Sequence, residues 1–520
     1  MPEFAQTTHM SISSSALPSN PLMYEINTRV WLRELSMRLH QPVQLDTVPD
    51  TELDRIAELG FHAVWLMGVW TTGPESLLIA RTRSELQHEY HETLHDFSAD
   101  DCIGSPYAVA SYVVSPKLGG NAALARLRER MARKGLNLIL DFVCNHTGRD
   151  HWMLETQPDV FVQGTEADFA AHPDAFFKTP QGKIIAFGRD PFFAPWTDTA
   201  QINYGQSAGR TAMLNKLMLL AEQCDGVRCD MAMLILPEIF KKTWGDLRGP
   251  NPIDRNFWVE AIEAVTAQHP HFIFLAESYW DKEAQLQSNG FHFTYDKILY
   301  DRLLKNDFWG VAQHLRGAIS YQKKCARFVE NHDEARAAQA FGSTRSISAA
   351  AVTLFTPGMR FIHEGQLEGR CVKVPVQLGR RPNELENAEI ELAYEHMLCS
   401  LRDPIFQSGH FAVIEAYAAG HGDRSNESLI ALQWTPNTCH TTSPRSRKVG
   451  YLIVVNLSGG RAYGRVPLSR DLVSEGKQYI FDDRFNGKRY DRDGGELLYP
   501  GLYIALEAFQ PHVFEISDKV

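Results

Sequence analysis

The most regular feature of the chain is a series of eight short apolar runs, separated by segments with a helical pattern. A short run of this kind is typical of a buried strand, and apolar residues recurring every three to four positions are typical of an amphipathic helix. The runs lie at 24–30, 62–67, 136–143, 226–230, 272–276, 291–295, 326–329 and 359–362. Eight strands alternating with helices predict a (β/α)8 TIM barrel, with functional residues at the carboxyl ends of the strands.

The clearest helical segments follow the first and second runs. In residues 50–59, Leu53, Ile56 and Leu59 share one face, and residues 121–134 form an amphipathic segment that ends before Gly135. A glycine directly after the last periodic residue is a common helix stop signal. Both segments fit the connecting helices of a barrel.

Two segments interrupt the alternation. Residues 146–204 are rich in Phe, Pro and Asp without a clear period, which suggests a subdomain inserted after the third strand. Later, alternating runs at 429–434, 451–457 and 502–506 are separated by Gly-, Asn- and Ser-rich turns, as expected for an antiparallel β-sandwich. The predicted domains are a tag-like stretch (1–18), the barrel in two parts (19–145 and 205–408), the inserted subdomain (146–204) and the C-terminal β-sandwich (409–520).

Composition and charge limit the classes of function. The 520 residues are 44% hydrophobic and 22% charged, as in ordinary globular proteins, and they exceed the size of a single core. A net charge of −11 argues against a nucleic acid or an anionic membrane surface as partner. No apolar run approaches the ~18 residues of a membrane span.

The cysteines and the N-terminus bear on location. Eight cysteines are spread along the chain without a C-x-x-C pair or a Cys/His metal spacing, so we interpret them as free thiols in a reducing compartment. The N-terminus lacks a basic segment followed by an apolar core, which is the pattern of a signal peptide. The predicted location is therefore the cytoplasm.

Candidate chemistry begins with Arg228 and Asp230 in the fourth run. Alternate residues of a strand point to the same side, so these two side chains share a face. A neighbouring cation keeps a carboxylate ionised, which makes Asp230 a candidate nucleophile. Taken alone, the pair fits a structural buried ion pair better than a nucleophile.

Three further runs end in polar residues. Asp141, Asn145 and His146 belong to the end of the third, Glu277 follows the fifth, and Glu330 to Asp333 follow the seventh. Carboxylates converging on one pocket repel each other unless their surroundings hold their protonation states apart. Such an arrangement is costly for stability and useful for acid–base chemistry.

These four segments resemble the four signature regions of the α-amylase superfamily, glycoside hydrolase family 13, in order and spacing. The region Asp-x-x-x-Asn-His matches residues 141–146, Gly-x-Arg-x-Asp matches 226–230, the third region supplies Glu277, and Asn-His-Asp matches 331–333. Tyr107 in Gly-Ser-Pro-Tyr and the Gln-Ile-Asn element at 201–203 add to the resemblance, which covers roughly residues 22–510.

The resemblance implies a role for each matching residue. Asp230 would be the nucleophile that forms a glycosyl-enzyme, Arg228 would keep it ionised, and Glu277 would be the general acid and base. Asp333 would bind the sugar 2- and 3-hydroxyls and favour the distorted ring of the transition state. The other expected sugar contacts are His146 and His332 through hydrogen bonds, Tyr107 by stacking, and Asp141.

Several of these roles have structural alternatives. Asp141 fits hydrogen-bond ordering of the site as well as sugar contact, and Tyr107 could be a core aromatic. In the family Asn145 often ligates a calcium ion, so a structural Ca²⁺ is considered, although the chemistry requires no cofactor. The aromatic residues of the insert, including Phe192, Phe193 and Trp196, fit packing better than sugar subsites.

Two stretches depart from the family pattern. Many α-amylases follow the nucleophile with Ala-x-Lys-His, where Lys and His hold reducing-side sugars, but here Met233 and Leu234 occupy those places. Short maltooligosaccharides or an unusual acceptor then become more plausible than starch. The loop at 363–381 carries Arg370, Lys373, Arg380 and Arg381, which could bind phosphate or form salt bridges with nearby glutamates, the interpretation we favour.

Three functions remain at this stage. The favoured one is a retaining hydrolase of α-glucosidic bonds, most plausibly α-1,4, in maltooligosaccharides or α-glucans. A transglycosidase or phosphorylase would use the same glycosyl-enzyme with another acceptor. A non-catalytic sugar-binding relative is the third, and the intact set of Asp230, Glu277 and Asp333 argues against it.

Overall fold

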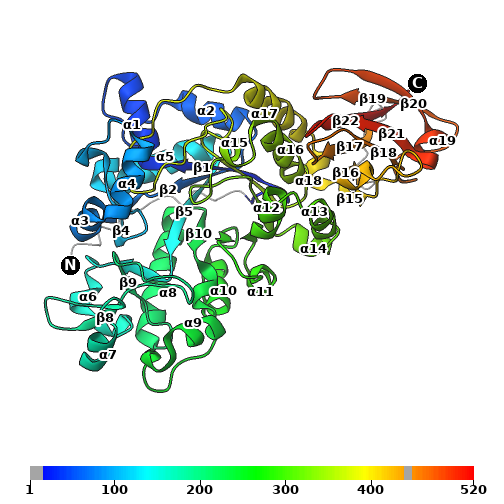
Figure 1. The fold of residues 1–520 in the computed structure, drawn as a ribbon. Coiled ribbons are helices and arrows are strands. Elements are labelled where there is room, and N and C mark those ends of the chain that lie inside the picture. The colour runs from blue at the N-terminus through cyan, green and yellow to red at the C-terminus, as the bar shows by residue number, and fades with distance from the viewer. Residues whose placement is uncertain (1–15, 438–447, 520) are drawn as a thin grey trace.

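Eight parallel strands close into a barrel in the computed structural model, which describes residues 16–437 and 448–519 (Figure 1). Around the barrel the order follows the chain, and the last strand pairs with the first. The strands are β1 (Leu22–Asn27), β2 (Ala63–Met67), β5 (Asn137–Val143), β10 (Gly226–Asp230), β11 (Ile273–Ala276), β12 (Phe293–Tyr295), β13 (Cys325–Arg327) and β14 (Met359–His363). The predicted TIM barrel is confirmed.

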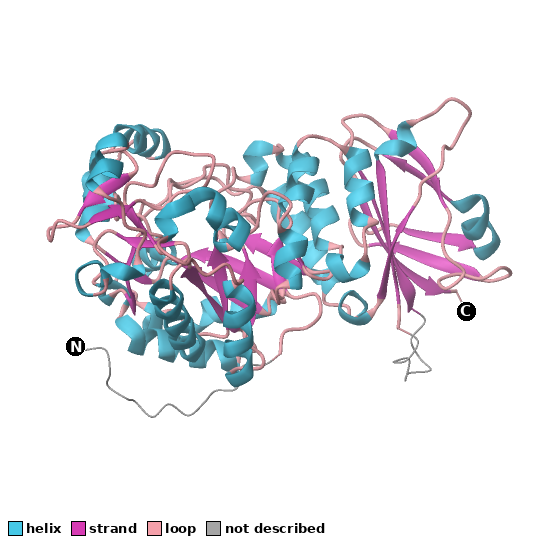
Figure 2. Cartoon of the chain, turned by 90° about the horizontal axis from the view of Figure 1, so that it is seen from below, coloured by secondary structure: helices cyan, strands magenta, loops and turns pink. Residues whose placement is uncertain are grey.

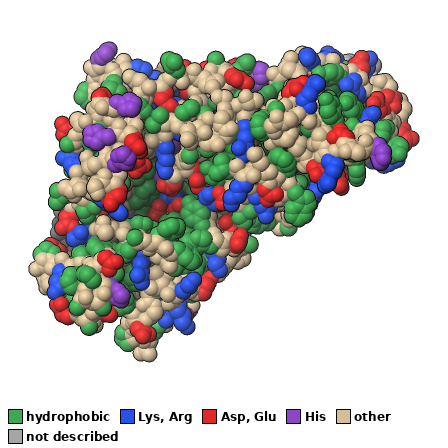
Figure 3. All heavy atoms as spheres, in the orientation of Figure 1, with side chains coloured by type: hydrophobic (Ala, Val, Ile, Leu, Met, Phe, Trp, Pro, Cys, Tyr) green, Lys and Arg blue, Asp and Glu red, His purple; other side chains and the backbone are tan. Residues whose placement is uncertain are grey.

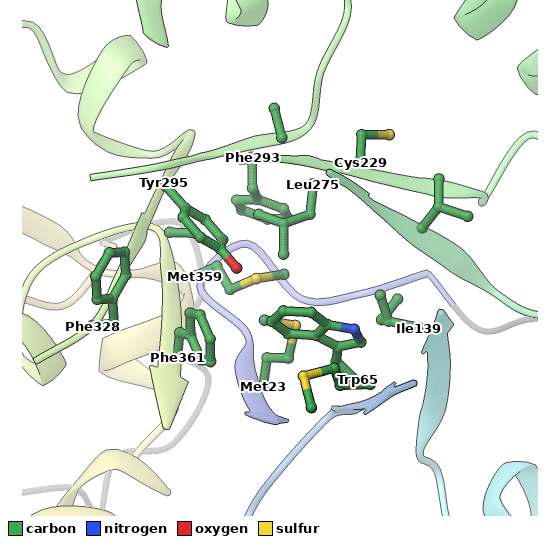
Figure 4. Close-up of a cluster of buried hydrophobic side chains, with 14 of the residues drawn as sticks. Met23, Trp65, Ile139, Cys229, Leu275, Phe293, Tyr295, Phe328, Met359 and Phe361 are labelled. Carbon is green, nitrogen blue, oxygen red and sulfur yellow. The ribbon is translucent and has the colours of Figure 1, made fainter. Parts of the chain in front are cut away.

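The barrel interior is filled by large apolar side chains (Figure 4). Met23, Trp65, Tyr295 and Phe361 are all buried and converge there from four different strands. Arg228 is also fully buried, and its guanidinium lies 5.1 Å from the centroid of the Trp65 ring. A cation over an aromatic face is favourable when both are removed from water. The core therefore ends in a fixed positive charge at the carboxyl end of the strands.

Helices surround the barrel, and α3 and α4 belong to an excursion between β2 and β5 (Figure 1). That excursion also contains β3 (Trp70–Thr72) and β4 (Val109–Val114). The main helices are α1 (Thr28–Leu39), α2 (Asp50–Glu58), α3 (Pro74–Thr82), α4 (Ser84–Thr93), α5 (Gly120–Arg133), α8 (Ser207–Gln223), α9 (Pro237–Trp244), α10 (Phe257–Gln268), α12 (Lys297–Leu304), α13 (Phe308–Leu315), α16 (Ser343–Leu354) and α17 (Ala388–Leu401). Within the described ranges, no helix combines the length and apolarity needed to span a membrane.

The predicted end of the first strand, 24–30, is wrong. The strand stops at Asn27, and α1 begins at Thr28. The Asn27 side chain accepts a hydrogen bond from the backbone N–H of Val30 at 3.4 Å, which is the geometry of a helix N-cap. The apolar residues after position 27 fit a helical face as well as an alternating strand, so the cap decides the boundary.

An irregular segment with short strands lies between β5 and α8. Its elements are β6 (His146–Gly148), α6 (Met153–Thr156), α7 (Glu166–Ala171), β7 (Phe176–Lys178), β8 (Ile184–Ala186) and β9 (Thr199–Gln201). β6 and β9 pair in antiparallel fashion, with His146 opposite Gln201. Both ends of the excursion are thus held at the carboxyl end of β5.

The C-terminal part contains two facing antiparallel sheets, the larger seen fanned out in Figure 2. The six-stranded sheet has the order β15 (His410–Ile414), β16 (Leu429–Thr435), β17 (Lys448–Asn456), β22 (Pro511–Asp518), β19 (Gln478–Asp483) and β20 (Arg489–Asp493), and the second contains β18 (Ala462–Val466) and β21 (Leu502–Leu506). Leu452 and Ile504 belong to the apolar cluster between the sheets. The other face of the large sheet packs against the barrel part of the chain. There the ring centroids of Trp434 and Phe406 lie 5.5 Å apart.

Candidate active site

Arg228 is the centre of a cluster of carboxylates at the carboxyl end of the barrel. Its Nη1 lies 2.6 Å from Asp230 Oδ1, and its Nη2 lies 2.7 Å from Glu277 Oε2. Asp141 and Asp333 are more distant, at 3.7 and 3.9 Å from the guanidinium. One buried cation is therefore surrounded by four acidic side chains, so their protonation states must differ.

The strand register brings these groups together. Arg228 lies opposite Asp141 on β5, and Cys229 lies opposite Ala276, the residue before Glu277, on β11. Gly226 starts β10 where a Cβ atom would approach the carbonyl oxygen of Ile273 to 2.6 Å, so the close strand pairing depends on glycine. The short strands thus bring residues distant in sequence to one guanidinium.

Glu277 is buried and accepts two hydrogen bonds. The Met231 backbone N–H donates to Oε2 at 2.7 Å, and the Tyr279 hydroxyl donates to Oε1 at 2.8 Å. Burial raises the pKa of Glu277 to about 7; Arg228 opposes this rise, and Asp230 adds to it. A carboxyl group with this pKa can both give and take a proton near neutral pH.

Asp333 is kept ionised, in contrast to Glu277. Its side chain is 46% exposed, and its Oδ2 lies 3.0 Å from His332 Nε2. Although desolvation opposes it, the charge and hydrogen bond of His332 lower the pKa of Asp333 well below its usual range. His332 also lies against Tyr107, whose hydroxyl is 2.7 Å from the same ring nitrogen. The Tyr107 and His332 rings are stacked with centroids 5.5 Å apart.

The Asp141 side chain is nearly inaccessible to solvent, and a backbone N–H holds its carboxylate in place. Its Oδ2 accepts a hydrogen bond from the Gly68 N–H at 3.2 Å. Burial raises the pKa of Asp141 to about 7, against the opposing charge of Arg228. These contacts favour the ordering role among the two that the sequence left open.

A cavity of about 390 Å³ opens above these carboxylates (Figure 3, between the barrel and the lower part of that view). Asp230, Glu277, Asp333, Tyr107 and His146 line it, and so do residues of α3, α4 and the insert. His146 is buried, and burial lowers its pKa, which keeps the ring neutral. Seven of the nine predicted site residues are thus at the cavity or within its carboxylate cluster, and His332 contacts Asp333 of that cluster.

Asn145 is the exception. Its amide exchanges hydrogen bonds with Gln201, since Asn145 Nδ2 donates to Gln201 Oε1 at 3.2 Å and Gln201 Nε2 donates to Asn145 Oδ1 at 3.0 Å. In the described part of the chain, no cluster of three or more His, Cys, Asp or Glu side chains could hold a metal. The Asn145 amide oxygen is engaged by Gln201, and the structural Ca²⁺ stays a prediction from which we derive no step.

The sequence reading missed Glu25 and Tyr279. Glu25 was visible only as one charge within an apolar run, and Tyr279 follows Glu277 at the spacing of two that places side chains on one side of an extended segment. The packing interpretation of the insert aromatics holds in part, because Trp196 packs against the core cluster. Trp196 lines the cavity, whereas Phe192 and Phe193 are 60% and 74% exposed.

The two departures from the family pattern have structural outcomes. Met233 and Leu234 are buried in the short turn after β10, so they face the core. Arg380 is paired with Asp96 and Asp101, and Arg381 with Glu34 and Glu364, as the salt-bridge interpretation of this loop predicted.

Comparisons with known proteins agree with this geometry. Residues 50–397 match the family model described as the α-amylase catalytic domain. α-Amylase MalA of Haloarcula japonica is 24% identical over 397 residues, which are 73% of this chain and 47% of that protein. A second match, to α-amylase 3 of Dictyoglomus thermophilum, covers 55% of that protein. The chain therefore spans about half the length of the curated relatives it matches.

Solved structures share the fold along nearly all of the chain. The maltogenic α-amylase AmyB of Thermotoga neapolitana superposes with a TM-score of 0.66 at 17% identity, covering 96% of this chain and 99% of that one. The α-amylase of Geobacillus thermoleovorans, solved with acarbose, gives 0.65 at 16% identity, covering 97% and 100%. With the family model spanning most of the chain and the carboxylate cluster at the barrel mouth, the chain belongs to the α-amylase family.

Proposed function

We propose that this protein is a retaining glycoside hydrolase that cleaves α-glucosidic bonds, in particular α-1,4 bonds, in maltooligosaccharides and α-glucans. The observation that carries the proposal is the sharing of one buried guanidinium by Asp230 and Glu277, at 2.6 and 2.7 Å. Two carboxylates on one guanidinium favour the ~5–5.5 Å separation of retaining enzymes over the ~6.5–9.5 Å of inverting ones. The amylase relatives support the choice of substrate class.

In this mechanism Asp230 attacks the anomeric carbon and forms a glycosyl-enzyme. Arg228 keeps the nucleophile ionised, and Glu277 protonates the leaving oxygen and then deprotonates the incoming water. Asp333, as an anion, accepts hydrogen bonds from sugar hydroxyls and stabilises positive charge developing on the ring. Tyr107, His332 and His146 hold the same sugar, and Asp141 orders the site through Gly68 and Arg228.

A second candidate is transglycosylation, and a pair of aromatic rings, one exposed and one half-buried, supports it. Phe192, in the insert, contacts Trp280, three residues after Glu277, with ring centroids 5.0 Å apart. Trp280 has a left-handed backbone with φ of 62°, a conformation that costs free energy and often occurs at functional sites. Trp280 directly follows Tyr279, which lines the cavity, so an apolar surface here would hold a sugar acceptor in preference to water.

Phosphate is not favoured as the acceptor. Arg380 and Arg381 are neutralised by carboxylates, and the Lys373 ammonium contacts the Asp333 carbonyl oxygen. The cytoplasm remains a proposed location, based on the free thiols of the seven described cysteines. Cys439 lies outside the described residues.

Product analysis on a panel tests the proposal. Maltooligosaccharides, starch, sucrose and trehalose are incubated with enzyme, with and without phosphate, and the first-formed anomer is followed by NMR. We expect α-anomeric maltooligosaccharides without a phosphate requirement. A β-anomer as first product would exclude the retaining mechanism, and products longer than the substrate would favour transglycosylation.

A further inference from the structure

A second carboxylate, that of Glu25, contacts His332 at the ring nitrogen that does not face Asp333. Glu25 lies on β1 and is fully buried, and its Oε1 is 2.5 Å from His332 Nδ1. Its other oxygen, Oε2, has no hydrogen-bond partner among the described residues. An isolated buried carboxylate is costly, so its pairing with His332 must compensate for its desolvation.

The two nitrogens of the His332 ring both face anionic oxygens. Nδ1 faces Glu25, and Nε2 lies 3.0 Å from Asp333 Oδ2. A neutral imidazole carries one N–H, so one lone pair would point at a carboxylate, whereas the imidazolium donates from both nitrogens. The Tyr107 hydroxyl, 2.7 Å from Nε2, is able to donate to a neutral ring, but only the doubly protonated ring donates to both carboxylates.

The other groups around His332 do not reverse this conclusion. Burial would lower the pKa of His332, but Asp333 and Glu25 raise it to about 10. His363 on β14 is buried, which lowers its pKa well below the usual value and keeps it neutral. The remaining titratable neighbours are Asp141 on β5 and Tyr107 before β4, and Arg228 on β10 lies 5.5 Å from the centroid of the Tyr107 ring.

We propose that Glu25 is a positioning residue that keeps His332 doubly protonated and, through it, keeps Asp333 ionised and oriented toward the sugar. The proposal rests on the proposed function only in assigning Asp333 to the sugar. A glutamine at position 25 can turn its amide N–H toward Nδ1, so it permits the neutral ring while preserving shape. It is therefore the charge of Glu25, and not the volume of its side chain, that keeps His332 doubly protonated.

The direct test is the side-chain ¹⁵N NMR spectrum of the ligand-free protein as a function of pH. The His332 signals are identified by their loss in His332→Asn. At pH 8 the parent should show an imidazolium at His332, and Glu25→Gln should move its titration down by ~1–3 pH units, the usual effect of one nearby charge. A neutral ring in the parent at pH 8, or an unchanged titration in the variant, would overturn the proposal.

Glu364→Gln is the matched control. Glu364 is also a buried carboxylate at a strand end, but it pairs with Arg381 at 2.9 Å, and Arg381 keeps Glu34 as a second partner. The control should leave the His332 titration unchanged. If Glu25→Gln fails to fold, Asp333→Asn removes the other anion at a half-exposed site and must shift the titration in the same direction; an unchanged titration there would equally overturn the proposal.

A binding experiment then connects the charge to the sugar. Maltoheptaose is titrated into Glu277→Gln by calorimetry between pH 6 and 9, because that change removes turnover and the Glu277 titration. In Glu277→Gln alone, the affinity for maltoheptaose should not change with pH. In the double variant Glu25→Gln/Glu277→Gln, the affinity should fall ~10-fold as the pH rises, which corresponds to the loss of one charge-assisted hydrogen bond. Identical pH profiles would contradict the proposal. Absence of binding in the parent would count against the proposed substrate instead, since the NMR result does not depend on sugar.

Discussion

The two sides of the cleavage site differ in chemistry. On the side of Asp333, the expected glycone contacts are charged and interlocked: Asp333, His332 and Glu25 form a chain with contacts of 3.0 and 2.5 Å. Beyond Glu277 in the chain, on the proposed leaving-group side, Trp280 contacts Phe192, and Met233 and Leu234 face the core. A hydrogen-bonded wall specifies one sugar ring closely, whereas an apolar surface tolerates different leaving groups and acceptors.

The largest expected effect comes from the carboxylates between the two sides. Asp230→Asn should lower kcat by at least ~10⁴-fold, because the amide is nearly isosteric but not nucleophilic. Glu277→Gln should cost a comparable factor, and the double variant little more, since the two act as one unit. Unchanged thermal unfolding provides the control, and losses that multiply in the double variant would contradict a shared mechanism.

The pH dependence sharpens the assignment of Glu277. The general acid must be protonated, so kcat/KM should fall as the pH rises through its pKa of about 7. Tyr279→Phe removes a donor that stabilises the ionised carboxylate, so the alkaline limb should move to higher pH by up to ~1 unit, equivalent to ~1.4 kcal/mol. A limb that moves to lower pH would show that the Tyr279 hydroxyl does not act as a donor to the carboxylate.

Substitution of Phe192 or Trp280, on the proposed leaving-group side, should have a smaller effect on activity. Phe192→Ala or Trp280→Ala should raise KM for maltoheptaose by ~2–10-fold, corresponding to ~0.5–1.5 kcal/mol for an aromatic contact, with less change for maltotriose. Trp309→Ala on α13 is the matched control, since Trp309 is likewise an exposed aromatic side chain, at 74%, but lies on a helix between β12 and β13 and does not neighbour Glu277 in the chain. Equal losses for both substrates would place the pair outside the leaving-group side.

The smallest expected difference concerns chain length. Met233 and Leu234 replace side chains that would hydrogen-bond reducing-side sugars, each bond contributing roughly 0.5–1.5 kcal/mol. Specific activity per reducing end on maltotriose to maltoheptaose should therefore exceed that on soluble starch. A higher kcat/KM on starch with a broad product ladder would contradict this expectation, and Trp196 on the cavity wall would be the next residue to change.

The barrel and the main carboxylates could be predicted from the sequence because their signals are local. Apolar runs mark the buried strands, and alternation puts Arg228 and Asp230 on one face, as β10 shows. The end of the first strand could not be predicted in this way, because the residues after Asn27 fit two periods and the cap contact at 3.4 Å decides between them.

Other features depend on contacts between distant residues. Glu25 meets His332 across 307 positions of sequence, and Gln201 satisfies Asn145 across 56, so neither pairing has a local pattern. The same holds for Phe192 and Trp280, which face each other only because the insert folds back over the barrel. The sequence alone determined which candidate groups lie at the strand ends, since residue type and strand period are local properties. Tertiary structure decided the protonation and partners of those groups, because burial and charge proximity exist only once distant segments are packed together.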